Sequence, residues 1–148
     1  MHTGLSVFQA FFDAIKDQSF VDAYEDTFDV VLADTDALKD KLFQLRYTVF
    51  CEENNCDEAS HYPDKKLKEP YDNWATHFLL IHKESGDVAG GASVVLPNRE
   101  KPLQGFPVQE MCDHPLVHIE GEVHRLCEIS RLFMAPRFRR RPEDGRLM

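Results

Sequence analysis

Residues 75–97, ATHFLLIHKESGDVAGGASVVLP, constrain the fold more than any other stretch of this chain. β-Branched and aromatic residues stand on both sides of Ser85-Gly86-Asp87, a short segment with the composition of a hairpin turn. The stretch therefore predicts two antiparallel strands joined by a tight turn. Gly90 and Gly91 lie inside the second strand, where missing side chains indicate a bulge or the close approach of another backbone.

A long amphipathic helix is predicted over residues 37–53, ALKDKLFQLRYTVFCEE, after candidate capping residues at positions 34–36. Its buried face is marked by four residues at three- and four-residue steps, namely Leu38, Leu42, Leu45 and Val49. Arg46 falls on or beside this face, so it needs an anionic partner. Two readings stay open: a structural ion pair with Glu69 or Asp72, or a set in which these residues order a lid over a substrate.

Weaker patterns complete the expected order of elements. Apolar residues at helical spacing predict a helix over residues 5–18, with a stripe of Leu5, Phe8, Phe12 and Ile15, and FDVVLA predicts a strand over 28–33. Residues 54–73 read as a loop, residues 97–124 as irregular with one helical turn near VQEMC, and LCEISRLFM as a further strand. We therefore expect one domain, 1–148, of α/β class with a mixed central sheet flanked by helices.

Charge and composition limit the partners of this chain. The formal net charge of −9 argues against nucleic acid or an anionic membrane as a general partner. Asp13 and Lys16 interrupt the N-terminal apolar stretch, and no run of about 18 apolar residues exists, so we expect a cytoplasmic chain without a membrane span. The local exception is RFRRR, which places Arg137, Arg139, Arg140 and Arg141 within five residues.

The cysteines indicate no metal site. Cys51, Cys56, Cys112 and Cys127 form no CxxC pair, and four reduced thiols are the simplest interpretation. Loose groupings such as Cys112 with His114 and His118, or Cys51 and Cys56 with His61, are weak evidence for a metal ligand set. We therefore expect no bound metal.

Glu128 and Arg131 stand in the middle of the last predicted strand, CEISRLFM. Residues three apart point to opposite faces of a regular strand. A bulge would change this parity, bring both side chains to one cleft and free backbone N–H groups to donate to a developing oxyanion. A buried structural ion pair is the alternative, and the sequence alone leaves both open.

Three separated motifs carry a family resemblance. LFQLRYTVFCEE, then YPDKKLKEPYDNWATHFLLIHKESGDVAGGASVVLP, then CEISRLFMAPRFRRR resemble the acyl-homoserine-lactone synthases and, more closely, the N-acyl amino acid synthase-like acyltransferases of PEP-CTERM/exosortase systems. Both groups belong to the GCN5-related N-acyltransferase (GNAT) superfamily. The likeness covers residues 28–141 in the same order. It implies an acyl-CoA N-acyltransferase-like fold of which this chain lacks the C-terminal part.

The resemblance also implies roles for individual residues. The acceptor side would be formed by residues of the first two motifs, namely Arg46, Phe50, Glu69, Asp72 and Ser93. Ser93 stands where the family commonly carries Arg, and Leu132 stands where Phe is usual. The catalytic strand would supply Glu128, Ser130 and Arg131, with Glu128 as the general base that takes the proton of the attacking amine.

The function expected from this resemblance is N-acyl transfer. A fatty acyl group would pass from an acyl carrier protein or coenzyme A thioester to the amine of an amino acid or similar small acceptor, with no permanently bound cofactor. Arg137, Arg139, Arg140 and Arg141 would dock the acidic carrier protein or its phosphopantetheine phosphate. The alternatives are a quorum-signal synthase that uses S-adenosylmethionine as acceptor, and an inactive domain that only binds a partner; a homodimer stays open.

Overall fold

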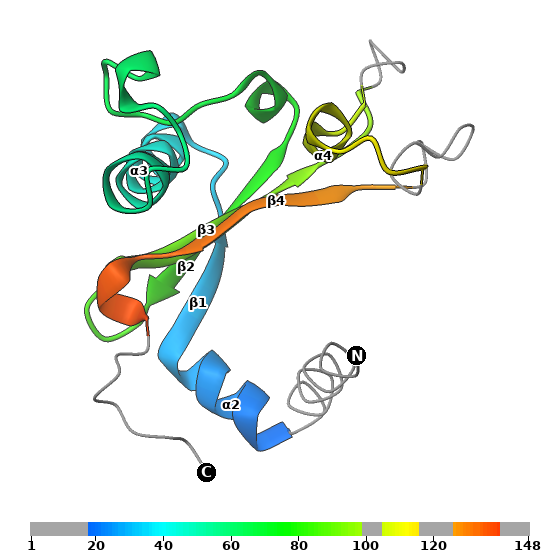
Figure 1. Ribbon diagram of the computed structural model, residues 1–148. Coiled ribbons are helices and arrows are strands. Elements are labelled where there is room, and N and C mark those ends of the chain that lie inside the picture. Colours follow the sequence, from blue (N-terminus) through cyan, green and yellow to red (C-terminus); the bar gives the residue numbers. More distant parts are fainter. Residues whose placement is uncertain (1–17, 99–104, 116–125, 140–148) are drawn as a thin grey trace, which may run out of the picture.

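The computed structural model describes residues 18–98, 105–115 and 126–139 (Figure 1). Its helices and strands are α2 (Gln18–Thr27), β1 (Phe28–Leu32), α3 (Asp36–Tyr47), β2 (Thr76–His82), β3 (Val88–Val95), α4 (Pro107–Met111) and β4 (Glu128–Met134). Each predicted strand is present, and the single helical turn expected near VQEMC is α4. The helix expected over 5–18 lies outside the described residues except for Gln18, and the sequence patterns did not indicate the rest of α2.

The four strands form one sheet in the order β1-β2-β3-β4 (Figure 1). Helices together with this sheet confirm the α/β class. All three pairings are antiparallel, so the parallel pair that a mixed sheet requires is not seen among the described strands. The β2–β3 hairpin turns at Ser85-Gly86-Asp87, as predicted. Gly86 has a φ of 70°, a left-handed conformation that glycine adopts without a steric penalty.

Gly91 allows α3 to pack closely on the sheet. A Cβ atom at this position would lie 2.7 Å from Leu42 Cδ1 and 2.8 Å from the Phe78 carbonyl oxygen. Both distances are too short for a real contact, so a side chain here would have to displace the end of the Leu42 side chain and the backbone of β2. The predicted close approach at this glycine is confirmed.

Helix α3 begins where the sequence predicted caps. The Thr35 side chain accepts a hydrogen bond of 3.3 Å from the Leu38 N–H, and Asp36 places a negative charge in the first turn. After Tyr47 the helix continues as a π-helical stretch, Thr48–Glu53. The whole predicted range is therefore helical, with wider turns at its C-terminal end.

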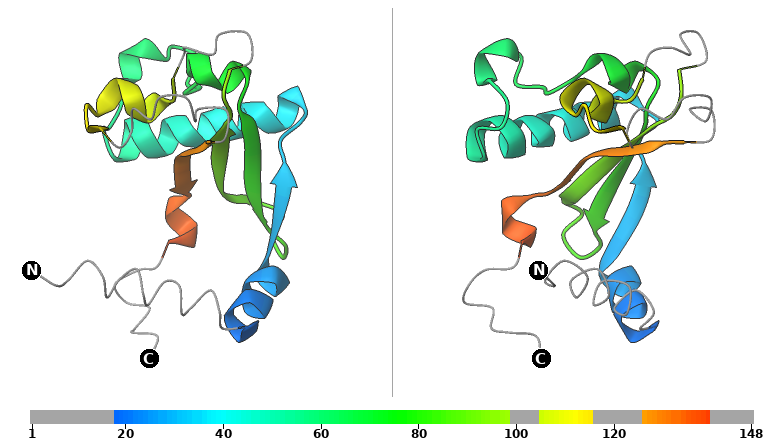
Figure 2. Two further views of the ribbon diagram at one scale, coloured as in Figure 1. Left: turned by 90° about the vertical axis from the view of Figure 1, so that its right-hand side faces the viewer. Right: turned by 45° about the vertical axis from the view of Figure 1, so that its right-hand side comes forward.

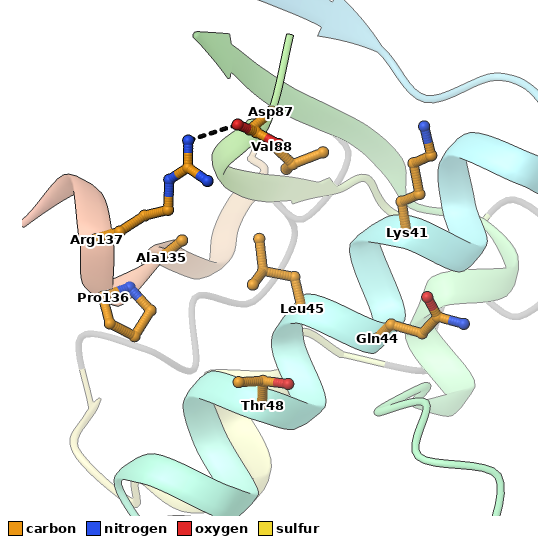
Figure 3. Close-up of a pocket in the computed structure, with 9 residues that line it drawn as sticks. All are labelled: Lys41, Gln44, Leu45, Thr48, Asp87, Val88, Ala135, Pro136 and Arg137. Atoms are coloured by element: carbon orange, nitrogen blue, oxygen red, sulfur yellow. Dashed lines mark hydrogen bonds and ion pairs between the residues drawn. The ribbon is translucent and has the colours of Figure 1, made fainter. Parts of the chain in front are cut away.

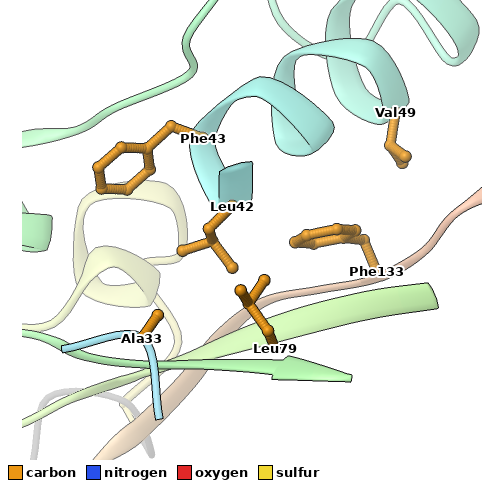
Figure 4. Packing of buried hydrophobic residues seen from close by; sticks show 6 residues of the cluster. All are labelled: Ala33, Leu42, Phe43, Val49, Leu79 and Phe133. Carbon is orange, nitrogen blue, oxygen red and sulfur yellow. The ribbon is translucent and has the colours of Figure 1, made fainter. Parts of the chain in front are cut away.

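The core lies between α3 and one face of the sheet (Figure 4). Leu42 and Leu79 are fully buried, and Phe133 is 5% exposed beside them. Burying side chains of this size contributes about 1.5–3 kcal/mol each. This cluster fixes the position of α3, and with it the position of Arg46.

Helices α3 and α4 lie on the same side of the sheet, whereas α2 lies at the end of β1 (Figure 2). The opposite side, which we call the open face, is apolar on three strands: Val30, Leu32, Phe78, Leu80, Ile129 and Leu132. Val30 pairs with Leu80 and Leu32 with Phe78, so these residues share one face. Val30, Ile129 and Leu132 are 65%, 68% and 74% exposed, and no helix of the described ranges covers them.

Candidate active site

Arg46 is buried in the last turn of α3 and is fully screened from solvent. Its Nη1 atom lies 2.9 Å from each carboxylate oxygen of Asp72, and its Nη2 atom donates to the Ser93 hydroxyl. The guanidinium also lies over the Phe43 ring, 5.3 Å from its centroid. The expected anionic partner is therefore confirmed as Asp72. Removing either member would leave a buried charge without compensation.

Asp72 is held in turn by the loop that carries it. The loop closes with a short 3-10 turn, Pro70–Asn73, and the second carboxylate oxygen of Asp72 accepts a bond of 2.8 Å from the Glu69 N–H. The side chain of Asp72 is only 5% exposed. Asp72 and Glu69, the two acidic residues that the resemblance singled out, are thus linked by a hydrogen bond from the Glu69 backbone to the Asp72 carboxylate.

His77 links this network to the sheet. It pairs with Ser93 across β2 and β3, and its Nδ1 atom lies 2.7 Å from the Ser93 hydroxyl, while Nε2 lies 3.3 Å from the Asp72 carbonyl oxygen. A carbonyl only accepts, so Nε2 carries the proton and Nδ1 accepts from Ser93. The Ser93 oxygen is then free to accept from Arg46. Burial lowers the pKa of His77, and the Arg46 charge acts in the same direction against the opposing effect of Asp72.

Sequence reasoning missed His77. It stands at an inward position of β2, where a histidine is indistinguishable from an ordinary core residue unless the register with Ser93 is known. Its neighbour in the network, Ser93, stands where the resemblance led us to look for Arg.

Strand β4 contains a bulge, one of the two alternatives that the sequence left open. Gly91 pairs with Phe133 and Ser93 with Ser130, so Ala92 alone faces two residues of β4, Arg131 and Leu132. Arg131 has a φ of 52°, a left-handed conformation that is strained for a residue with a side chain. The extra residue reverses the alternation of side chains along the strand. As a result, residues on both sides of the bulge point toward α3.

The Arg131 side chain is bound by two carboxylates. Its Nε and Nη2 atoms lie 2.8 and 2.6 Å from the oxygens of Glu69, and Nη1 lies 2.8 Å from Asp57. The guanidinium lies 5.1 Å from the centroid of the Phe50 ring. Hydrogen bonding to Glu69 raises the pKa of Arg131, so this side chain stays charged.

The residues expected on the acceptor side therefore form one continuous network. It runs from Ser93 through Arg46 and Asp72 to the Glu69 backbone, and from the Glu69 carboxylate to Arg131 and the Phe50 ring. Arg46 is paired with one carboxylate of the loop over residues 54–73, and Arg131 with two. The structure thus brings together the five expected acceptor-side residues and Arg131.

Glu128 and Ser130 lie on the same face of β4 as Arg131 but have other neighbours. Glu128 is half-buried, and its Oε2 atom accepts a bond of 2.9 Å from the Val108 N–H in α4. The Ser130 hydroxyl makes no hydrogen bond within the described ranges. Nearby, Tyr71 donates to Glu110, and burial together with this acceptor raises the pKa of Tyr71. Glu128 thus stands beside further carboxylates at the α4 end of the sheet.

The arginines after β4 are engaged with the protein itself. Arg137 pairs with Asp87 at the hairpin turn, and Arg139 contacts Glu53 at 2.6 and 2.8 Å. Arg139 also donates two bonds, of 2.9 and 2.7 Å, to the Met134 carbonyl oxygen, so it ties the end of β4 to the π-helical stretch. Arg140 and Arg141 lie outside the described residues.

A pocket of about 510 Å³ opens beside these arginines, between α3 and the corner that follows β4 (Figure 3). Leu45, Val88 and Pro136 supply its apolar lining. Lys41 and Arg137 stand on opposite sides of it, and Arg137 is held there by Asp87 (Figure 3). The pocket thus combines an apolar lining with cationic groups.

The described ranges contain no metal-binding cluster, no disulfide and no membrane-spanning helix. No group of three or more histidine, cysteine, aspartate or glutamate side chains is placed to hold a metal ion among the residues the structure covers. All four cysteines are free. None of the helices in the described ranges has the length and apolar character needed to cross a bilayer.

Comparison with known proteins identifies one family. The family model described as acetyltransferase (GNAT) domain matches residues 45–147, which is more than half of the chain. Neither the curated proteins nor the solved structures include a match. The matched range contains Arg46, the loop with its two carboxylates, the hairpin and the bulged strand β4.

Proposed function

This chain belongs to the GNAT acetyltransferase domain family, and we propose that it moves a fatty acyl group from a thioester to an amine. The donor is an acyl carrier protein or coenzyme A thioester, and the acceptor is an amino acid or a similar small amine. The resemblance of its three motifs to the N-acyl amino acid synthase-like acyltransferases supports this choice of substrates. In the reaction the amine nitrogen forms an amide bond with the acyl carbon, and the carbon–sulfur bond breaks to release the thiol.

The observation that carries the proposal is the bulge in β4. A bulge leaves one residue of a strand without a ladder partner, and a backbone N–H freed in this way can donate to the oxygen of the tetrahedral intermediate. Glu128 lies three residues before Arg131, on the same face as a result of the bulge. In the proposed reaction its carboxylate takes the proton of the attacking amine, directly or through water, because only the neutral amine is a nucleophile.

The arginine network forms the wall of the acceptor side. Arg46 and Arg131 are held by Asp72 and Glu69, so their roles are to position the loop and shape the site rather than to react. Arg131 is 21% exposed, whereas Arg46 is fully buried. A carboxylate of an amino acid acceptor would therefore meet Arg131, whose guanidinium still reaches solvent.

The donor side of the proposal rests on the corner after β4. Lys41 and Arg137 beside the pocket suit the phosphate of phosphopantetheine, and Arg140 and Arg141 are the remaining candidates for contact with an acidic carrier protein. Salt shortens the screening length from ~10 Å at 0.1 M to ~3 Å at 1 M. Replacing Arg140 and Arg141 by Gln should weaken carrier-protein binding and flatten its salt dependence in a titration. Unchanged affinity and salt slope would favour coenzyme A as donor.

The direct test replaces the proposed base. Glu128→Gln keeps the shape and the bond to the Val108 N–H but removes the proton acceptor, so thiol release with saturating amine should fall by ~10²- to 10⁴-fold. Glu110→Gln is the matched control, because it removes a neighbouring carboxylate charge and still lets Tyr71 donate. Equal turnover of the Glu128 variant and the unmodified chain would remove Glu128 from the catalytic role.

One observation favours a second candidate, a domain that binds a partner without reacting. Arg46 and Arg131 are each paired with carboxylates of the loop, as they would be in a purely structural network, although the buried Nε atom of Arg46 has no hydrogen-bond partner within the described ranges. Thiol release from acyl donors separates the two functions, since a binding domain releases none with any amine. Offering S-adenosylmethionine beside amino acids distinguishes a quorum-signal synthase from an amino acid N-acyltransferase.

A further inference from the structure

His77 is a buried polar residue that has no role in the reaction proposed above. It is 2% exposed, and both of its ring nitrogens are engaged. Nδ1 lies 2.7 Å from the Ser93 hydroxyl, and Nε2 lies 3.3 Å from the main-chain oxygen of Asp72. The ring also meets the Phe43 ring edge-on, with centroids 5.5 Å apart and planes at 83°. Strand β2 thus holds this imidazole in one orientation, directed at the turn that carries Asp72.

The ion pair between Arg46 and Asp72 fixes the orientation of this turn only in part. Two parallel N–H donors on the two oxygens of a carboxylate set its direction as well as its distance. Here a single nitrogen, Nη1, serves both oxygens of Asp72, while Nη2 donates to Ser93 and Nε has no hydrogen-bond partner within the described ranges. The bond from the Glu69 N–H lies within the same segment and moves with it. The carboxylate can therefore pivot about Nη1 unless a second attachment holds the turn.

We propose that His77 is a positioning residue for the acceptor side of the site. By holding the Asp72 main-chain oxygen, it fixes the turn to which Asp72 belongs, and with it the position of Glu69. Asp72 and Glu69 are tied to each other by two bonds, of 2.8 and 3.0 Å, so they move together. Glu69 in turn lies 2.8 and 2.6 Å from two nitrogens of Arg131. A displacement of the turn is thus passed on to the Arg131 guanidinium.

This inference rests on the proposed function, in which the carboxylate of an amino acid acceptor meets Arg131. The proposed base lies outside the network, because Glu128 is bound to the Val108 N–H of α4. His77 should therefore affect how tightly the acceptor binds and not how fast the bound complex reacts. A substitution with this effect raises the KM for the amine and leaves kcat unchanged.

Two substitutions of His77 separate its two hydrogen bonds. The amide oxygen of Asn is as many bonds from the main chain as Nδ1, so His77→Asn can accept from Ser93 but is too short to reach the Asp72 oxygen. The amide nitrogen of Gln is as many bonds from the main chain as Nε2, so His77→Gln can still donate to Asp72. Each variant gives up one hydrogen bond between neutral groups, so their free energies of unfolding should fall alike. A purely structural role would therefore not distinguish them.

Thiol release measures the effect on acceptor binding, with a saturating acyl donor and the amino acid that gives the fastest release with the unmodified chain. The KM for this amino acid should rise about 5- to 10-fold in His77→Asn and less than about 2-fold in His77→Gln, with kcat within about 2-fold in both. Equal KM values in the two variants, or a loss confined to kcat, overturn the proposal. A KM raised more than about 5-fold in His77→Gln also overturns it, even if His77→Asn does not fold.

Amide hydrogen exchange tests the same inference without any reaction. The N–H groups of Glu69 and Asp72 should exchange at least about 5-fold faster in His77→Asn than in His77→Gln. The N–H of His82, bonded to Asp87 in the hairpin, is the internal reference and should exchange equally in both. Equal exchange of the Glu69 and Asp72 amides in the two variants overturns the proposal. If no amino acid gives thiol release with the unmodified chain, the proposed function fails separately, and faster exchange confined to these two amides still supports His77 as the residue that positions the turn.

Discussion

Replacing Ser93 by Ala is the sharpest test of the buried network, because a single hydroxyl joins Arg46 to His77. The change removes the acceptor of an Arg46 N–H and the donor to His77 Nδ1, while both groups stay buried. A hydrogen bond to a charged group contributes about 1.5–3 kcal/mol, and one between neutral groups contributes about 1 kcal/mol. The free energy of unfolding should therefore fall by about 3 kcal/mol.

Urea unfolding followed by the fluorescence of the single tryptophan is a suitable assay. Trp74 adjoins the loop that holds Asp72 and contacts the Tyr71 ring edge-on, with ring centroids 5.3 Å apart. With a slope of about 1–3 kcal/mol per M urea, the expected loss shifts the midpoint by at least about 1 M. The shift should appear without a change in slope if the variant stays two-state.

Ser130→Ala is the matched control for this prediction. Ser130 faces Ser93 across β3 and β4, and its hydroxyl has no hydrogen bond within the described ranges, so the same substitution should cost no more than about 0.5 kcal/mol. A loss below about 1 kcal/mol for Ser93→Ala, or equal losses for the two variants, would refute the proposed sharing of one hydroxyl by two buried partners.

Three further predictions follow from the same geometry. Burial lowers the pKa of His77, so at pH below ~6.5 the unfolded chain binds more protons than the folded chain. The free energy of unfolding should therefore decrease as the pH falls, by up to ~1.4 kcal/mol per pH unit. His77→Gln should reduce this decrease in urea titrations at pH ~7.5 and ~5.5. Arg131→Gly should be about 1 kcal/mol more stable than Arg131→Ala, because only glycine adopts a φ of 52° without strain; the reverse order would count against the strained bulge. Arg139→Gln should cost about 1–2 kcal/mol through the lost bonds to Met134 and Glu53, whereas Arg137→Gln, in an exposed pair, should cost less than ~0.5; thermal melts of the two variants compare them directly.

Local patterns predicted those parts of the fold that depend on neighbouring residues. The Ser85-Gly86-Asp87 turn and the amphipathic stripe of α3 act within a few positions, so the hairpin and the helix could be predicted. The odd spacing of Glu128 and Arg131 raised the bulge only as one of two alternatives. An arginine beside an apolar stripe also implies a buried anion, and Asp72 was one of two expected partners.

Features that depend on register between distant segments could not be predicted. His77 meets Ser93 only because β2 and β3 align in one particular way, and Arg139 reaches Glu53 across 86 positions. RFRRR was expected to act as one docking cluster, yet its first and third residues have different structural partners. The exposure of the open face likewise follows from sheet topology, which a single sequence does not reveal.

The strand order also determines the order in which the strand pairs form during folding. Ile81 pairs with Val88 seven positions later, whereas the nearest pairs of the other strands are Leu32 with Phe78 (78 − 32 = 46) and Val95 with Glu128 (128 − 95 = 33). The loop-closure cost grows as (3/2)RT ln n, so joining β1 or β4 costs about 1.7 or 1.4 kcal/mol more than closing the hairpin. We therefore expect the hairpin to form first. During synthesis at about 5–20 residues per second, the backbone groups on the outer edge of β3 stay unpaired for roughly 2–7 s until β4 has been made.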